Sequence, residues 1–216
     1  MGPGMSILVF GASGGLTADV EESCARLGVT VLALVMNRDL PAAVLDRSRL
    51  CRAGDLPPEA QGAGFVCPLF TPANRRMAVA EALALGLEPA AALVDPGAIV
   101  ARSAVLGPGC YVNGGAMIGA AGAFGRFVIV NRGAGIGHHA EIGDFVSIGP
   151  GATVAGNVRI GPGAMIGAGA VVAPGIAIGA DCVVAPGAVV LRDLPANRMA
   201  VGNPARVLPR AEATMA

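Results

Sequence analysis

The chain has 216 residues, and its 15 basic residues, all arginine, balance 15 acidic residues to give a formal net charge of zero. A neutral chain carries no basic surface of the kind that binds nucleic acid or an acidic membrane. Glycine is abundant, with 33 residues, yet 54% of the chain is hydrophobic. This combination differs from a disordered glycine-rich segment and predicts an ordered fold with many turns.

The cysteines and the long uncharged runs indicate the cellular compartment of the protein and whether it enters a membrane. The five cysteines are odd in number and form no CxxC pair, which predicts reduced thiols in a cytoplasmic protein. The N-terminus lacks the basic segment and apolar core of a signal peptide. The uncharged runs 103–125 and 160–180 are long enough to span a bilayer, but their repeated glycines argue against a helix, so we expect no membrane insertion.

The N-terminal stretch "SILVFGASGGLTADVEESCARLGVTVLALV" predicts a βαβ unit. A third strand and a second helix follow it and complete an α/β domain over 5–88. This length is roughly half of a full dinucleotide-binding sheet, so we describe the domain as half-Rossmann-like. The expected elements are a strand over 6–10, a glycine-rich turn over 11–15, a helix over about 17–27, a strand over 29–35, a strand near 64–69 and a helix near 72–86.

The turn after the first strand carries Gly11, Gly14 and Gly15. Glycines at this place bring backbone N–H groups and a helix N-terminus close to a phosphate. They also form a tight strand–helix turn without any ligand, and both interpretations stay open. The spacing is GxxGG rather than GxGxxG, and the second strand ends in "VMNRD" without an acid at its tip to hold a ribose. These departures argue against a nicotinamide cofactor.

From Val94 to Val190 an apolar residue recurs at every sixth position. Neither a helix nor simple strand alternation has this period, whereas a chain that forms a short strand and turns a corner every six residues does. Three hexads make one triangular coil of about 18 residues, and stacked coils form a β-helix. We assign it to 89–195 and a C-terminal cap or tail to 196–216, because stacked coils need capped ends. The predicted inward residues are Val94, Val100, Leu106, Val112, Ile118, Phe124, Val130, Ile136, Ile142, Ile148, Val154, Ile160, Ile166, Val172, Ile178, Val184 and Val190.

His138 and His139 occupy the third and fourth positions of their hexad, counted from the inward Ile136. These positions form the corners of a coil and are mostly Pro-Gly or other small residues elsewhere, so we expect both imidazoles to project outward. Imidazole suits general-base catalysis at neutral pH. An exposed pair without chemistry is the alternative, and a metal site is disfavoured because the chain has no third histidine.

The segment "IGHHAEIGDFVSIGPGATVAGNVRIGPGAMIGAGAVVAPG" and the C-terminal "VGNPAR" at 201–206 resemble the NeuD/PglD/PerB type of sugar acetyltransferase, a branch of the hexapeptide-repeat acyltransferases. The resemblance covers nearly the whole chain. It implies an α/β half-Rossmann-like domain followed by an all-β left-handed parallel β-helix, and a homotrimer with active sites between subunits. It also implies acetyl-CoA as co-substrate and a nucleotide-linked amino sugar as acceptor.

The resemblance further implies roles for individual residues. His138 matches the catalytic base, Asn131 matches a residue close to it, and His139 stands where relatives carry a carboxylate beside the base. The implied CoA contacts are Ser147, which replaces a common histidine, and Gly156, Ala168 and Pro186. The implied nucleotide contacts are Ser13, Gly14 and Gly15, with Met36 and Asn37 in place of acidic residues after the second strand.

We therefore expect an acetyl-CoA-dependent N-acetyltransferase that acts on the amino group of a nucleotide-linked amino sugar. The alternatives are O-acetylation of a sugar such as sialic acid, acyl transfer to a non-sugar amine, and a catalytically weakened trimeric scaffold. The departures at His139, Ser147 and positions 36–37 keep the scaffold interpretation open.

Overall fold

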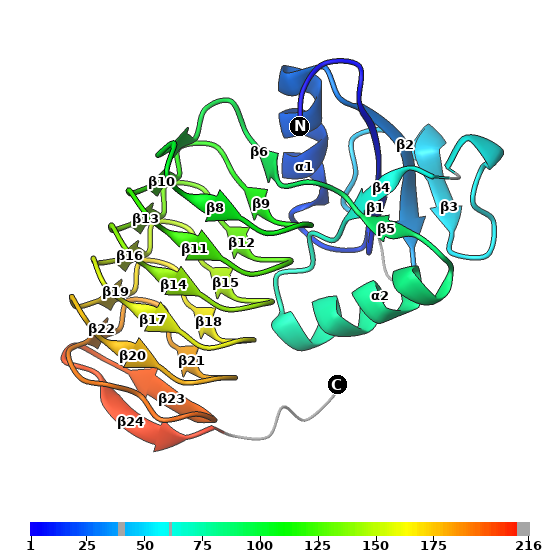
Figure 1. The fold of residues 1–216 in the computed structure, drawn as a ribbon. Coiled ribbons are helices and arrows are strands. Elements are labelled where there is room, and N and C mark those ends of the chain that lie inside the picture. Colours follow the sequence, from blue (N-terminus) through cyan, green and yellow to red (C-terminus); the bar gives the residue numbers. More distant parts are fainter. Residues whose placement is uncertain (39–41, 61, 211–216) are drawn as a thin grey trace.

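A computed structural model describes residues 1–38, 42–60 and 62–210. These residues form an α/β unit followed by a triangular prism of short parallel strands (Figure 1). The prism is a left-handed parallel β-helix, so the predicted fold class is confirmed.

The N-terminal sheet has, within the described residues, five parallel strands in the order β3-β2-β1-β4-β5. The sheet is wider than predicted, because β3 and β5 are too short to give a recognisable sequence pattern. β2 begins one residue later than predicted, and β4 is shorter than the predicted third strand. The bounds are β1 (Ser6–Phe10), β2 (Thr30–Met36), β3 (Leu50–Arg52), β4 (Gly64–Val66) and β5 (Glu88–Pro89).

The helices of this unit agree closely with the sequence prediction. α1 (Thr17–Leu27) has the predicted bounds and ends at Gly28, whose φ of 67° stops the helix in the left-handed conformation. α2 (Pro72–Ala84) begins at the predicted residue, with proline in its first turn, and ends two residues early. Short 3₁₀ turns lie at Arg47–Arg49 and Pro58–Ala60. No helix in the described ranges has the length and apolar character needed to cross a membrane.

The prism consists of two-residue strands, β6 to β22, and the second residue of each is one of the predicted inward apolar residues. Each strand up to β19 pairs in parallel with the strand one coil further on, as Ile118 pairs with Ile136, so a coil has the predicted eighteen residues. The bounds are β6 (Leu93–Val94), β7 (Ile99–Val100), β8 (Val105–Leu106), β9 (Tyr111–Val112), β10 (Met117–Ile118), β11 (Ala123–Phe124), β12 (Ile129–Val130), β13 (Gly135–Ile136), β14 (Glu141–Ile142), β15 (Ser147–Ile148), β16 (Thr153–Val154), β17 (Arg159–Ile160), β18 (Met165–Ile166), β19 (Val171–Val172), β20 (Ala177–Ile178), β21 (Val183–Val184) and β22 (Val189–Val190).

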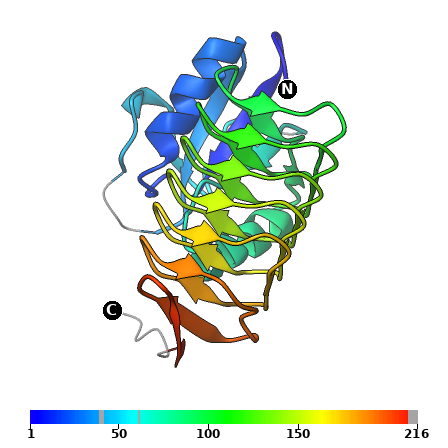
Figure 2. The same cartoon turned by 90° about the vertical axis from the view of Figure 1, so that its left-hand side faces the viewer.

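The strands form three sheets, which are the sides of the prism. Sheet 1 contains β6, β9, β12, β15, β18 and β21; sheet 2 contains β7, β10, β13, β16, β19 and β22; sheet 3 contains β8, β11, β14, β17 and β20. Each coil runs from sheet 1 to sheet 2 to sheet 3, so we name the three edges of the prism edge 1/2, edge 2/3 and edge 3/1. Figure 2 shows the stacked coils from the side, with the α/β unit behind them.

A hairpin closes the C-terminal end of sheet 1. β23 (Arg198–Val201) pairs in parallel with β21, and β24 (Arg206–Pro209) pairs antiparallel with β23. The hairpin pairs with the backbone N–H and C=O groups of β21, which would otherwise form an open sheet edge. Residues 211–216 of the expected C-terminal segment lie outside the described residues.

The corners share one backbone conformation. The fourth position of every hexad from Gly109 to Gly187 has a positive φ, which glycine adopts freely and other residues adopt at a cost. The non-glycine residues among these described corners are Ala121, Phe127, His139, Phe145, Asn157 and Asp181.

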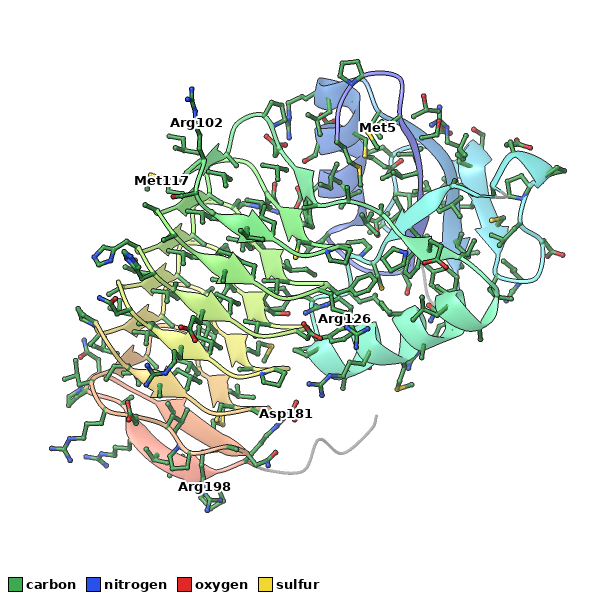
Figure 3. The ribbon with its side chains drawn as sticks, in the orientation of Figure 1. Met5, Arg102, Met117, Arg126, Asp181 and Arg198 are labelled. Carbon is green, nitrogen blue, oxygen red and sulfur yellow. The ribbon has the colours of Figure 1, made fainter. Side chains whose placement is uncertain are left out.

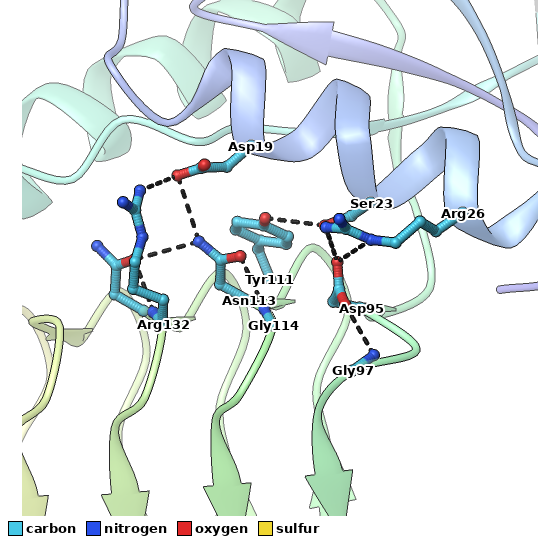
Figure 4. A network of polar contacts seen from close by, with 10 residues as sticks. Asp19, Ser23, Arg26, Asp95, Gly97, Tyr111, Asn113, Gly114 and Arg132 are labelled. Atoms are coloured by element: carbon cyan, nitrogen blue, oxygen red, sulfur yellow. Dashed lines mark hydrogen bonds and ion pairs between the residues drawn. The ribbon is translucent and has the colours of Figure 1, made fainter.

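The α/β unit packs on sheet 1. Along edge 1/2, the Asp95 carboxylate accepts hydrogen bonds from Ser23 at 2.6 Å and from the Arg26 guanidinium at 2.5 Å, both on α1 (Figure 4). Burial of Asp95 acts to raise its pKa, but the bonds from Ser23, the Gly97 N–H and Arg26 outweigh burial and hold the pKa below its usual range. Asp19 of α1 binds Arg132 further along the same edge.

Edge 3/1 is attached to the α/β unit by different contacts. The rings of Phe127 and Phe145 stack with centroids 5.5 Å apart, and Phe127 also contacts Phe65 of β4. Arg76 of α2 forms an ion pair of 2.8 Å with Asp181. The α/β unit therefore covers sheet 1 and its two edges, which leaves edge 2/3 as the edge on the far side of the prism.

Candidate active site

The glycine turn after β1 lines a pocket of about 260 Å³. The structure brings the predicted Ser13, Gly14 and Gly15 together in its wall. It also adds residues that the sequence analysis missed, from the end of β2 and the start of α2. These are Arg38, Leu69, Phe70, Thr71 and Asn74.

Two helix N-termini meet at this pocket. α1 begins just after Gly15, and α2 begins just after Thr71. Within the described residues, neither start is capped by a side-chain hydrogen bond, so free backbone N–H groups remain there. Their positive dipole ends and the exposed Arg38 suit an anionic group such as a phosphate.

The glycines of the turn serve two different purposes. A side chain on Gly11 or Gly14 would meet Leu69 at 2.9 Å or 3.1 Å, so these two glycines allow Leu69 to pack against the turn. A Cβ on Gly15 would have no described heavy atom within 4 Å. Gly15 therefore borders open space in the pocket, where a ligand can approach the backbone.

The structure does not place Met36 and Asn37 in this pocket. Met36 packs against the apolar cluster around β1 and β2. Asn37 donates a hydrogen bond of 3.2 Å to Glu81 of α2, and its Oδ1 is buried without a partner among the described residues. Arg38, two residues after the end of β2, lines the pocket instead. It is part of "VMNRD", but no motif in the sequence marked it as a pocket residue.

His138 and His139 lie on edge 2/3 and are exposed. Their Nδ1 atoms are 3.1 Å apart, and the rings are nearly perpendicular at 84°. One Nδ1 must therefore carry the hydrogen and the other must accept it. The corners one coil away on either side hold Ala120, Ala121, Gly156 and Asn157, so no charged residue occupies them.

Gly156 provides the space for the His138 imidazole. A Cβ on Gly156 would lie 2.7 Å from His138 Nε2 and 2.8 Å from Cε1. Any larger residue would therefore displace the ring. Gly156, for which the resemblance implies a CoA contact, packs beneath the predicted base.

Asn131 lies on edge 1/2, away from His138 of the same chain. It is buried and accepts hydrogen bonds from Asn113 at 3.2 Å and from the Arg132 N–H at 2.8 Å. Asn113 also donates to Asp19 of α1, so Asn131 is tied to the first turn of that helix (Figure 4).

The remaining implied CoA residues are distributed over two places. Ala168 and Pro186 are exposed on edge 1/2, one coil apart, with the Gly187 N–H bonded to the Ala168 carbonyl at 2.8 Å. Ser147 is fully buried under the α/β unit, where it donates to the Phe70 carbonyl and accepts from Arg75. A buried hydroxyl with both bonds satisfied cannot contact CoA, so we leave Ser147 out of the site.

Sheet 2 presents an exposed apolar stripe between edges 1/2 and 2/3. Ile99, Met117 and Val171 on its outer surface are 68%, 53% and 37% exposed. Figure 3 shows Met117 on the side of the prism away from both helices. Gly135 and Thr153 lie between Met117 and Val171, so the contiguous apolar part of this stripe is the pair Ile99 and Met117, which suits contact with another surface.

An exposed imidazole pair and a pocket lined by two helix N-termini and an arginine would suit group transfer to a phosphorylated acceptor. Among the described residues, no cluster of three or more His, Cys, Asp or Glu side chains could hold a metal ion. The repeats and the prism define the chain as a hexapeptide-repeat transferase, and the sequence model of the family "Bacterial transferase hexapeptide (six repeats)" matches residues 157–192.

Comparison with solved structures indicates which kind of hexapeptide-repeat transferase the chain is similar to. The chain is 32% identical to the perosamine N-acetyltransferase PerB of Caulobacter crescentus over 95% of this chain and 97% of that one, with a TM-score of 0.80; PerB is solved in complex with CoA and GDP-perosamine. It is 31% identical to the acetyltransferase domain of PglB from Neisseria gonorrhoeae, solved with acetyl coenzyme A, over 94% and 98% of the two chains, with a TM-score of 0.81. WeeI of Acinetobacter baumannii, 24% identical over 94% and 100% of the chains with a TM-score of 0.78, shares the fold. A search of the curated proteins gives no match. The chain belongs to the sugar acetyltransferases of the hexapeptide-repeat superfamily, as the sequence resemblance predicted.

Proposed function

We propose that the protein transfers the acetyl group of acetyl-CoA to the amino group of a nucleotide-linked amino sugar. The observation that carries this proposal is the presence, in a chain similar to PerB over 95% of its length, of both an anion-binding pocket and an outward imidazole pair. We assign nucleotide binding to the α/β domain, 5–88, and acyl transfer to the β-helix, 89–195.

His138 is the base in this proposal. When His139 Nδ1 accepts the Nδ1–H of His138, the lone pair of His138 Nε2 is free to take a proton. Nε2 takes that proton from the sugar amine as its nitrogen bonds to the thioester carbonyl carbon. The tetrahedral intermediate then breaks the C–S bond, and the proton passes from His138 to the leaving thiolate. No covalent acyl-enzyme is needed, because alignment of amine and thioester supplies much of the rate.

The proposal requires neighbouring subunits. Asn131 and the first turn of α1, which begins next to the pocket, lie beside edge 1/2, whereas His138 lies on edge 2/3, and the outer face of sheet 2 separates them. A closed homotrimer that buries the three sheet 2 stripes together brings edge 2/3 of one subunit against edge 1/2 of the next. Each active site then combines a base from one subunit with a nucleotide pocket from its neighbour.

Acetyl-CoA fits the groove between two such edges. Edge 1/2 contributes Ala168, Pro186 and glycine corners, whose small size allows the pantetheine arm to lie close to the backbone. Gly156 and His138 face them from the neighbouring subunit. Exposed arginines near the C-terminal end of the prism are available for the CoA phosphates; they are Arg192, Arg198 and Arg206. The five free cysteines support a reducing, cytoplasmic location.

Release of the CoA thiol measures the proposed reaction directly. Acetyl-CoA is incubated with UDP-, GDP- and dTDP-linked amino sugars, and each amino sugar is matched by its hydroxyl counterpart. We expect thiol release with an amino sugar and none with its hydroxyl counterpart. Release with the hydroxyl compound alone indicates O-acetylation, release only with non-sugar amines rejects the nucleotide sugar, and no CoA binding by calorimetry indicates a scaffold.

Mixed trimers test whether the site lies between subunits. His138→Ala removes the base, and Gly15→Leu fills the pocket of an otherwise intact chain. Each variant alone is expected to be inactive. Co-refolding the two in equal amounts should restore about a quarter of the active sites, because a site is intact when each subunit supplies its unaltered half. No recovery from correctly assembled mixed trimers would show that base and pocket act within one chain.

A further inference from the structure

Arg75 of α2 is a fully buried cation bound only by neutral oxygen atoms. Its Nη1 and Nη2 atoms donate five hydrogen bonds, and its Nε has no partner among the described residues. The acceptors are the carbonyl oxygens of Leu69, Phe70, Phe145 and Val146 and the hydroxyl of Ser147. In the described part of the chain, no carboxylate lies within ion-pair distance of Arg75.

The nearby ionisable groups do not neutralise this charge. Burial raises the pKa of Cys67 to about 12 and that of Cys110 to about 11, so both thiols are neutral at neutral pH. Arg76, the next residue, is itself cationic and is paired with Asp181. Burial lowers the pKa of Arg75 to about 10, which still leaves the guanidinium charged at neutral pH. A buried charge without a counter-charge is destabilising, so a compensating use is expected.

Arg75 lies directly behind the wall of the nucleotide pocket. Leu69 and Phe70, whose carbonyl groups it binds, both line that pocket. In a planar trans peptide the N–H points opposite to the carbonyl. With the carbonyls of Leu69 and Phe70 turned towards Arg75, the N–H groups of Phe70 and Thr71 are turned away from it, on the pocket side of the wall.

The same side chain ties the pocket wall to the β-helix. Nη2 bonds the Phe145 carbonyl at 2.6 Å, and Nη1 bonds Ser147 Oγ at 3.0 Å. Ser147 in turn donates to the Phe70 carbonyl. The orientation of the wall is therefore fixed relative to the prism.

We infer that Arg75 is a positioning residue for the phosphates of the acceptor: its buried charge, and the peptide groups that it orients, make the pocket select diphosphate-bearing ligands without direct contact. This inference rests on the proposed function. A positive charge one peptide unit behind the wall acts through a medium of low dielectric constant, where it is screened less than a surface arginine. The counter-charge of Arg75 is then supplied by the ligand.

Binding of nucleotides to the full-length protein, measured by calorimetry, tests the inference. The probes are UDP, GDP and dTDP, the matching monophosphates, and acetyl-CoA as a ligand of a different site. In Arg75→Met we expect Kd for the best-bound diphosphate to rise at least tenfold, Kd for its monophosphate to rise less, and Kd for acetyl-CoA to stay within twofold. An equal loss for diphosphate and monophosphate would overturn the charge role.

Two further variants separate charge from tethering. Ser147→Ala breaks the link to Phe70 and keeps the charge, so the affinity for the diphosphate should fall less than threefold. A loss as large as that of Arg75→Met would mean that Arg75 acts only mechanically. Arg75→Lys keeps the charge and decides the question if Arg75→Met does not fold, because loss of the diphosphate preference in folded Arg75→Lys overturns the inference. If the unaltered protein binds acetyl-CoA but no nucleotide, the proposed function itself fails.

Discussion

Replacing Gly156 with alanine tests whether the position of one imidazole controls catalysis. The new methyl group would lie 2.7 Å from His138 Nε2, 2.8 Å from Cε1 and 3.1 Å from Cδ2. These distances are shorter than any ordinary carbon contact, so the exposed ring must move by about 1 Å or rotate away. Gly156 does not have the positive φ of its neighbouring corner residue, so alanine fits the backbone there.

The expected effect is large on rate and small on stability. A shift of about 1 Å in a catalytic group lowers the rate by up to about 100-fold, so we expect kcat to fall between about 10-fold and 100-fold. This corresponds to about 1.4–2.7 kcal/mol in the activation barrier. The free energy of unfolding should change by less than about 1 kcal/mol, because alanine restricts the unfolded chain and the displaced ring is exposed.

Steady-state kinetics with acetyl-CoA varied distinguishes this mechanism from lost CoA contact. Displacement of the base lowers kcat and leaves the KM for acetyl-CoA within about twofold, whereas lost contact with CoA raises that KM. Gly54→Ala is the control, since a Cβ there has no described neighbour within 4 Å, and its kinetics should be unchanged. If the single variant His138→Ala is inactive but Gly156→Ala keeps full kcat, then the position of the His138 ring does not control the rate.

Three further predictions follow from the described contacts. His139→Ala should lower kcat about tenfold at unchanged KM, because His138 loses the partner of its Nδ1. His139→Glu should restore activity. Equal kcat in the unaltered protein and both variants would show that His139 does not assist His138. If the proposed trimer forms through sheet 2, Met117→Arg should convert it to monomers in light scattering and abolish activity, whereas Leu45→Arg, on an exposed site outside sheet 2, should do neither. Asp95→Asn should lower the free energy of unfolding by about 1–3 kcal/mol at pH 7, as the bonds to Ser23 and Arg26 weaken. Because the native pKa of Asp95 is depressed, this difference should be present above about pH 4 and disappear as the pH falls through the native pKa; a difference that persists in acid would contradict the assignment.

The periodic part of the fold could be read from the sequence because one constraint repeats. Every inward position from Val94 to Val190 fills the same interior slot, so a pattern six residues long specifies strand, corner and register together. The strands β3 and β5 escaped detection because a strand of two or three residues carries no periodicity and is held by its neighbours in the sheet.

The site was predictable only where a residue acts through its own chemistry. The outward position of His138 followed from its place in the hexad, and Gly15 from the glycine turn. The burial of Ser147 and the placement of Arg75 depend on how the α/β unit packs on sheet 1, and the contact of Asn37 with α2 depends on packing within that unit. No local pattern encodes that packing, because its partners are more than forty residues apart in the chain.

The left-handed corners have a consequence for engineering. A non-glycine residue in this conformation costs roughly 1 kcal/mol relative to glycine. On edge 1/2 these corners are all glycine, whereas edge 3/1 holds Phe127, Phe145 and Asp181, which attach the α/β unit. Edge 2/3 holds Ala121, His139 and Asn157 in successive coils. Ala121→Gly would relax the backbone without removing any side-chain hydrogen bond found among the described residues, whereas asparagine, as at position 157, tolerates this conformation. This expected gain in thermal tolerance lies next to the imidazoles that we propose to be catalytic, so stability and turnover can be changed at neighbouring corners.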